Sequence, residues 1–396
     1  MVKNYTSIGD SFMKNFVRLS EVCTISASKA NIEEECAWLL NLDKVESKTG
    51  RILEHEVVPR EKLNGSIVQF DTENVLYSKL RPNLNKVVLP EENGYATSEM
   101  LPLRPCESKL TKGYLAEYLR SDNFVSWAVG KTAGAKMPRL GTKVLMDKMI
   151  PLPPLEEQHK IVSLFSVVNH VISLRQQQLA KLDELVKARF VEMFGNPVLN
   201  DKGWKLKSLS NLTKKIGSGA TPKGGKEVYQ ENGVAFIRSM NVYNGKFEYK
   251  ELAYISDEQA CKLDGVTVKE KDVLLNITGA SVARSCVVPT DILPARVNQH
   301  VCIIRCGESI IPEFLNKILI DDNYQNFLWN IAGSGATREA ITKQQVENLQ
   351  IITPPIERQG AFVEFCKQIE GLKILMQRSL EQMKTLKKAL MQQYFG

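Results

Sequence analysis

One sequence occurs twice in this chain, and the repeat limits what the chain can fold into. PLPPLEEQHKIVSLF, from Pro151, returns in altered form as TPPIERQGAFVEF, from Thr353. Residues 134–195 align with residues 335–396 without a gap, and 16 of the 62 positions are identical. Further upstream, GYLAEYLRSDNF weakly matches PEFLNKILIDDNY. A period this long does not fit a solenoid and indicates a tandem duplication of a domain followed by a helix.

The end of each copy is predicted to be one long helix. Pro153 and Pro154 block a helix upstream, Glu156 and Glu157 suit the positive N-terminal end, and Gly195 supplies a stop. About forty residues remain, which gives roughly 60 Å at about 1.5 Å per residue. Each helix could pack separately on its own domain, but that length favours pairing of the two helices with each other.

Apolar residues at helical spacing line one face of each predicted helix. In the second copy they recur about every 3.6 residues, which is the helical period. In the first copy a polar patch at residues 175–178 interrupts the series. The seam of the first copy comprises Ile161, Leu164, Val168, Val171, Leu179, Leu182, Val186, Phe190 and Met193. The seam of the second comprises Phe362, Phe365, Ile369, Leu372, Met376, Leu380, Met383, Leu386, Leu390 and Tyr394.

Short β-like runs separated by turn residues precede each helix. They are SIVQF, NVLYSKL, NKVVLP and MLPLRP in the first copy, and GVAFIRSM, DVLLNIT, RSCVVP and HVCIIRC in the second. A short helix should follow, at residues 115–129 and at residues 312–331. We therefore expect an α+β chain in four parts: β-rich domains at 1–152 and 199–352, and long helical regions at 153–198 and 353–396.

Composition narrows the class of protein. With 396 residues and 43% hydrophobic side chains, the chain can bury more than one core. It has no apolar run long enough to span a bilayer and no apolar signal-peptide centre near the N-terminus, so a cytoplasmic location without membrane contact is expected. Eight cysteines without a C-x-x-C motif favour buried free thiols over zinc ligands. A net charge of +7 permits an anionic partner.

The order of domain, helix, domain and helix, with PLPPLEEQHKIV and LDELVKARFVEMFGNP in the repeat, resembles the specificity subunit of type I restriction-modification systems. NVLYSKLRPNLNKVVLP, YATSEMLPLRP, GSGATPKGGKEVYQENGVAFIRSMNV and RVNQHVCIIR look like segments of its target-recognition domains. The resemblance implies two such domains alternating with two helices that pair as an antiparallel coiled coil. It also implies a bipartite, asymmetric target on double-stranded DNA, with two methyltransferase subunits and ATP-driven restriction subunits as partners.

The chain carries no convincing catalytic motif. GATPKGGKE fails the phosphate-loop pattern, because Gly225 stands where that pattern requires lysine. Neither an N-P-P-aromatic adenine pocket nor a Gly-rich methyl-donor loop is found. We therefore expect a non-catalytic subunit without a cofactor of its own, whose partners bind S-adenosylmethionine, ATP and magnesium. A protein scaffold that does not read DNA, and a detached recognition half of a single-chain restriction enzyme, are the alternatives.

Residues for DNA contact are expected in Gly- and Pro-marked turns, where arginine can bind guanine, asparagine adenine, and lysine phosphate. The candidates in the first domain are Lys79, Arg81, Lys86, Lys136 and Arg139. Those in the second are Lys223, Arg238, Asn276, Arg284, Arg338 and Lys343. Some of them could instead fix strands through surface ion pairs, and Arg81, which precedes Pro82, could be structural.

Overall fold

The computed structural model describes residues 15–26, 35–63, 66–222, 224–333 and 339–396. The chain divides into two compact units. Unit 1 comprises residues 1–177 and 377–396, and unit 2 comprises residues 178–376. Both boundaries fall inside the long helices, so each unit contains one globular domain and one end of each helix.

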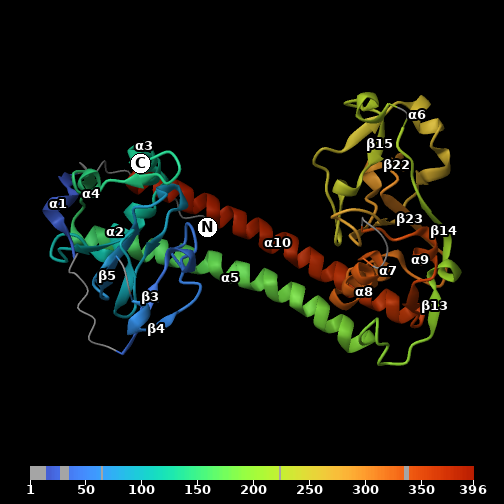
Figure 1. The fold of residues 1–396 in the computed structure, drawn as a ribbon, viewed down its shortest axis with the longest axis horizontal. Coiled ribbons are helices and arrows are strands. Elements are labelled where there is room, and N and C mark those ends of the chain that lie inside the picture. The colour runs from blue at the N-terminus through green and yellow to red at the C-terminus, as the bar shows by residue number, and fades with distance from the viewer. Residues whose placement is uncertain (1–14, 27–34, 64–65, 223, 334–338) are drawn as a thin grey trace, which may run out of the picture. The chain divides into compact units, whose positions relative to one another are not determined.

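Two four-stranded sheets build the globular domain of unit 1 (Figure 1). The antiparallel sheet has the order β2 (Cys23–Ile25), β9 (Met100–Pro105), β6 (Val75–Ser78), β7 (Val87–Val88). The second sheet has the order β4 (Val57–Pro59), β3 (Cys36–Leu40), β8 (Gly94–Thr97), β5 (Ile67–Phe70), with β3 and β8 parallel. A pair of strands, β1 (Phe16–Arg18) and β12 (Met149–Pro151), leads into the first long helix. The four β-like runs of the first copy are confirmed as β5, β6, β7 and β9.

Unit 2 repeats this topology strand for strand. Its antiparallel sheet has the order β14 (Thr213–Ser218), β23 (Val301–Cys306), β20 (Val273–Asn276), β21 (Ser285–Val287). The second sheet has the order β18 (Ala253–Ile255), β15 (Val234–Ile237), β22 (Ala295–Val297), β19 (Thr267–Val268), with β15 and β22 parallel. The pair β13 (Leu206–Ser208) and β24 (Gln350–Ile352) leads into the second long helix. The duplication therefore includes the whole globular domain, where sequence similarity is weak.

The short helix predicted in each copy is wrong in one respect, because two helices stand in its place. Unit 1 has α2 (Lys112–Arg120) and α3 (Asp122–Gly130), separated by Ser121 in an extended conformation. The Ser121 hydroxyl accepts a hydrogen bond from the amide of Phe124 and caps the second helix. Unit 2 has α7 (Pro312–Leu319) and α8 (Asp322–Gly333), and Asp321 accepts amide hydrogen bonds at the start of α8.

Short elements complete the two domains. They are the helices α1 (Leu19–Val22), α4 (Thr142–Met146), α6 (Asp257–Cys261) and α9 (Lys343–Glu347), and the strand pairs β10 (Thr132–Ala133) with β11 (Arg139–Leu140) and β16 (Val242–Tyr243) with β17 (Lys246–Phe247).

The long helices are α5 (Leu155–Phe194) and α10 (Ile356–Phe395), each of 40 residues, as predicted. In unit 1 the ring of Phe165 stacks on that of Phe395. In unit 2 the rings of Phe190 and Phe362 lie 5.5 Å apart, centroid to centroid. Within each unit, residues late in one helix meet residues early in the other, so the pair is antiparallel (Figure 1).

The predicted apolar seam is buried or half-buried along α5 and along most of α10. Leu372 and Leu386 are exceptions, with exposed fractions of 46% and 42%. Lys373, next to Leu372, instead lies 2.9 Å from Asp183 of α5. The helical period locates the face of α10 that packs, but it does not show where an ion pair replaces an apolar contact.

A buried glutamine fixes the start of each long helix to its own domain. In unit 1 the Gln158 side chain accepts a hydrogen bond from the Thr111 amide at 2.9 Å and donates to the carbonyl oxygens of Lys109 and Pro153. In unit 2 the Gln359 side chain likewise accepts a hydrogen bond from the Ile311 amide and donates to the carbonyl oxygens of Ser309 and Pro354. Both side chains are fully buried. The repeat therefore carries its own attachment to the domain before it.

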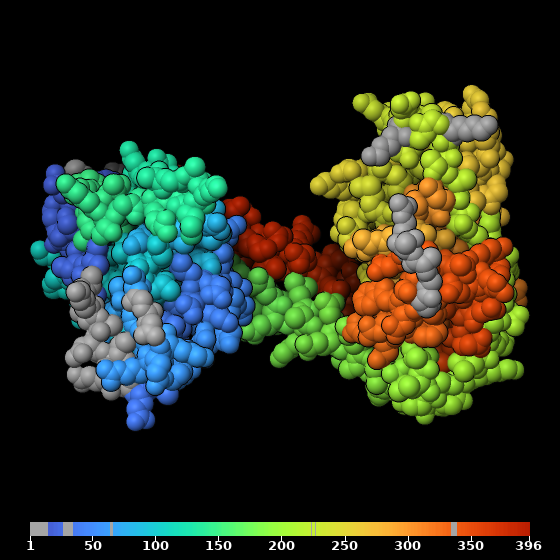
Figure 2. Space-filling view, viewed as in Figure 1, coloured from blue at the N-terminus to red at the C-terminus, as the bar shows by residue number. Residues whose placement is uncertain are grey.

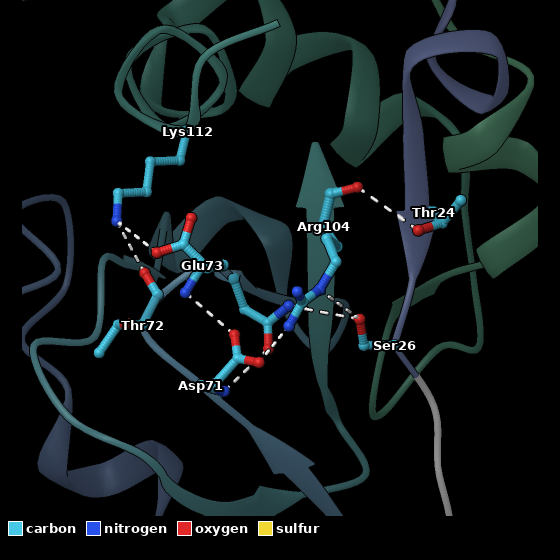
Figure 3. A network of polar contacts seen from close by, with 8 residues as sticks. Thr24, Ser26, Asp71, Thr72, Glu73, Arg104 and Lys112 are labelled. Carbon is cyan, nitrogen blue, oxygen red and sulfur yellow. Dashed lines mark hydrogen bonds and ion pairs between the residues drawn. The ribbon is translucent and has the colours of Figure 1, made fainter. Parts of the chain in front are cut away.

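A polar network ties β9 to the segment before β6 in unit 1 (Figure 3). Arg104 forms an ion pair with Asp71 and donates to the Ser26 hydroxyl at 3.3 Å. Lys112, the first residue of α2, donates to the carbonyl oxygen of Thr72. In unit 2 Arg305 of β23 holds the buried Asp272 with two hydrogen bonds of 2.8 Å. In each domain, an arginine of one strand of the antiparallel sheet thus pairs with an aspartate that precedes the neighbouring strand.

Candidate DNA interface

Two segments far apart in the sequence pair with each other in unit 1. Leu80 forms a β-bridge with Arg139. The Arg81 amide donates to the Pro138 carbonyl at 2.8 Å, and the Leu140 amide donates to the Lys79 carbonyl at 2.9 Å. We call residues 78–81 together with 138–140 the unit-1 turn pair. In the space-filling view, the green atoms of the part of unit 1 that follows β9 lie beside the blue atoms of its earlier strands (Figure 2).

The unit-1 turn pair gathers basic side chains that were predicted separately. Arg81 and Arg139 are exposed, and Lys79 is half-buried. Lys136 is exposed in the loop that joins β10 to β11. Four of the five candidates in the first domain therefore lie in the unit-1 turn pair or in the loop beside it, and basic side chains there suit contact with a phosphate backbone or with base edges.

The fifth candidate, Lys86, is engaged within the domain. Its ammonium donates to the Leu42 carbonyl at 2.5 Å, and the side chain is half-buried. This contact joins the start of β7 to the segment that directly follows β3 of the second sheet. In this structure, Lys86 therefore contributes to packing within the domain.

Arg81 adopts a left-handed backbone conformation, with φ 49° and ψ 65°. For a residue with a side chain, this region costs about 1 kcal/mol relative to ordinary backbone. At the equivalent position of unit 2 stands Gly279, with φ 76°, which carries no such penalty. The two units therefore differ at this turn, with a strained arginine in unit 1 and an unstrained glycine in unit 2.

Unit 2 has the same turn pair, formed by residues 276–279 and 339–341. Thr278 bridges to Ala340, and the Gly279 amide donates to the Glu339 carbonyl at 3.0 Å. The Thr278 hydroxyl is hydrogen-bonded to the Nδ1 atom of His300. The unit-2 turn pair therefore repeats the backbone of its counterpart, but Gly279 and Ala340 stand at the positions of Arg81 and Arg139.

The prediction that Asn276 reads a base does not agree with its position. Its side chain is fully buried, and its amide donates to the Ser239 carbonyl at 2.8 Å and to the Ser281 hydroxyl at 3.2 Å. A side chain enclosed in this way holds the turn and does not reach the surface. A sequence pattern of turn residues cannot distinguish an amide that faces solvent from one that supports the loop.

Of the remaining described candidates of unit 2, Arg238 and Arg284 lie in loops and Lys343 is the first residue of α9. The Arg284 guanidinium stacks over the Tyr243 ring at 4.4 Å, and its carbonyl accepts the Asn276 amide beside the turn pair. Arg238 lies over the Tyr229 ring and donates to the Glu251 carbonyl. Lys343 is exposed at the start of α9, 3.5 Å from Glu347. Lys223 and Arg338 lie outside the described residues.

The candidates predicted from the sequence do not include Glu99 and His300. Each directly precedes the last strand of the antiparallel sheet, β9 or β23, and each side chain contacts its turn pair. Glu99 holds Arg139, as His300 holds Thr278. The signal that could have found them is this shared position before the MLPLRP and VCIIRC strands.

Cysteines and acidic residues form no metal centre in the part of the chain that the structure describes. Burial raises the pKa of the Cys23, Cys286 and Cys302 thiols to about 12, so they stay protonated at neutral pH. The expectation of buried thiols is wrong for Cys36, Cys106 and Cys261, which are exposed.

Across the described ranges, no helix is both long and apolar enough to cross a membrane.

Comparison with known proteins identifies relatives over most of the chain. A family model for the type I restriction modification DNA specificity domain matches residues 13–184 and again residues 201–385. The specificity subunit of the type I restriction enzyme MjaVIII of Methanocaldococcus jannaschii is 24% identical over 363 residues, which are 88% of this chain and 82% of that protein. The specificity subunit of the EcoBI enzyme of Escherichia coli is 21% identical over 72% of this chain and 65% of its own length.

Two solved structures share the fold. One, from a study of complex assembly and conformational transition of the type I R-M system, covers 96% of this chain and 97% of its own, with a TM-score of 0.64 and 20% identity. The S subunit of a type I restriction-modification system from M. genitalium covers 98% of both chains, with a TM-score of 0.61 and 11% identity.

Proposed function

The chain belongs to the family of type I restriction modification DNA specificity domains, and from this premise we propose that it reads a bipartite, asymmetric DNA target and directs partner enzymes to it. It is a type I specificity subunit that recognises DNA and has no catalytic role of its own. The finer proposal concerns how the target is divided and which subunits act on it.

The observation that carries this proposal is the duplicated turn pair with different side chains. The backbone hydrogen bonds match between the units, while Arg81 and Arg139 in unit 1 correspond to Gly279 and Ala340 in unit 2. Two similar domains with different contact groups suit two half-sites of different sequence. The target should therefore be split and asymmetric, with an unread spacer whose length depends on the paired helices.

The partners in this proposal are two methyltransferase subunits and, for cleavage, ATP-dependent restriction subunits. These subunits would bind S-adenosylmethionine, ATP and magnesium, and the complex would act in the cytoplasm. Exposed apolar side chains on α5 and α10 favour protein contact along the helices, because apolar groups on a surface gain by burial. They include Val167, Leu174, Leu185, Leu372, Ile374 and Leu375.

The test is the methylated-adenine motif in cells that carry this gene with its cognate methyltransferase. We expect two short sequences separated by a fixed unread spacer. Exchanging residues 1–152 for the equivalent domain of a relative should change one half of the motif and leave the other half intact. A change in both halves would contradict separate recognition domains. Methylation without any sequence motif would favour a scaffold that does not read DNA.

A further inference from the structure

Arg139 of the unit-1 turn pair is hydrogen-bonded to Glu99, which lies outside that pair, through one nitrogen of its guanidinium. The Nε atom of Arg139 donates to both oxygens of the Glu99 carboxylate, at 3.0 and 3.2 Å. Within the described residues, the structure records no hydrogen bond for either terminal nitrogen of this guanidinium. The two terminal NH2 groups are therefore left for an acceptor pair outside the chain, while the Nε–H group fixes the plane of the guanidinium.

Glu99 is held by the antiparallel sheet of unit 1. It directly precedes β9, and its backbone carbonyl accepts the Lys79 amide at 3.0 Å. Its side chain is 24% exposed, against 45% for Arg139. The carboxylate is thus held between the sheet and the turn, and the arginine that it orients extends into solvent.

Stability does not explain this ion pair. An ion pair that is exposed to this degree contributes little to folding. Unit 2 builds the same turn without it: the Ile277 amide donates to the His300 carbonyl at 2.9 Å, in the place of Lys79 and Glu99, and Ala340 stands in the place of Arg139. The same backbone hydrogen bonds form in both units. The turn therefore does not need the Arg139–Glu99 ion pair, which changes only the exposed surface of unit 1.

We propose that Arg139 reads a guanine in the half-site of unit 1 and that Glu99 is the positioning residue that orients it. Two parallel N–H groups match the O6 and N7 acceptors that guanine presents in the major groove. Holding the guanidinium in one plane before binding reduces the rotamer freedom lost in the complex. This inference rests on the proposed function and assigns one base contact within it.

The experiment measures binding of the complex with its methyltransferase subunits to duplexes in which each base pair of the target is changed in turn. For Arg139→Gln, we expect discrimination at one G·C pair of the unit-1 half-site to fall by roughly tenfold or more, in line with the loss of a bidentate contact. Discrimination throughout the unit-2 half-site should stay as in wild type, which also shows that the variant is folded.

Glu99→Gln separates positioning from contact. It should reduce discrimination at the same G·C pair, by less than Arg139→Gln does, and the double variant should match Arg139→Gln alone, because Glu99 acts through Arg139. The matched control is Glu46→Gln, which removes the partner of Arg51 in another exposed ion pair of unit 1 and should leave every position unchanged.

Three outcomes would overturn the inference: an equal loss of affinity for all duplexes in Arg139→Gln, an effect of Glu99→Gln at a different base pair, or a unit-1 half-site without guanine. The first would make Arg139 a phosphate contact. Failure of the proposed function looks different, because the wild-type complex would then show no preference for any duplex.

Discussion

The ring of Phe165 in α5 stacks on the ring of Phe395, the last residue of α10, with centroids 5.9 Å apart and planes 20° apart. Both side chains are buried, and the Phe395 ring also lies 5.4 Å from that of Tyr114 in α2. In unit 2 Phe194, the last residue of α5, packs edge to face with Phe314 of α7, with ring centroids 4.8 Å apart. Each long helix thus begins against the domain before it and ends in the core of the other domain.

Phe395→Ala should lower the free energy of unfolding by about 3 to 5 kcal/mol, because it leaves a cavity among aromatic side chains. Urea denaturation followed by circular dichroism measures this. Val167→Ala, at a 60% exposed position of α5, is the control and should change stability by about 0.5 kcal/mol or less. Equal stability of Phe395→Ala and wild type would contradict the observed helix pairing.

Gln158→Leu and Gln359→Leu should each destabilise the chain by about 2 to 4 kcal/mol. Either change leaves one buried amide without an acceptor and two carbonyl oxygens without a donor. The measurement is the urea midpoint, with Gln176→Leu at an exposed position of α5 as the control. If only one of the two variants were destabilised, the two attachments would not be equivalent.

Arg81→Gly should leave the free energy of unfolding within about 1 kcal/mol of wild type, since relief of the left-handed strain offsets the greater freedom of glycine in the unfolded chain. DNA affinity should fall, and a lost phosphate contact would reduce the salt dependence of binding by about one unit in slope. Fluorescence anisotropy across a salt series measures both.

Gly279→Arg is the matched reverse variant, because an added Cβ meets no atom within 4 Å and only the backbone strain remains. It should cost about 1 kcal/mol in stability and increase DNA affinity at low salt. A strongly destabilised Arg81→Gly protein would show that the arginine serves the fold.

Shortening both long helices should alter the unread spacer of the proposed target. Removal of residues 171–177 and 377–383 takes seven residues from each helix, or about 10 Å, which is close to three base-pair steps of about 3.4 Å. The methylated motif should keep both half-sites with a shorter spacer. An active complex with the original spacer would exclude the helices as the element that sets the distance.

The long helices and the central strands were predictable from the sequence because their signals are local. Prolines before Glu156 and a glycine after Phe194 bound α5, and a 3.6-residue period identifies its buried face. Strands such as β9 and β23 are mostly apolar runs, each with one arginine near its end. The division between α2 and α3 was missed, since the capping role of Ser121 depends on the backbone conformation that it adopts.

The contact surfaces depend on tertiary structure. The sequence determined that the chain is a duplication with two long helices and basic turns, because periodicity, proline and glycine act over a few residues. Only the fold brings Arg139 beside Leu80 and Glu99, and only the fold buries Asn276 beneath its own loop. Pairing between distant segments and removal of a side chain from solvent are properties of the packed chain, so no local pattern could specify them.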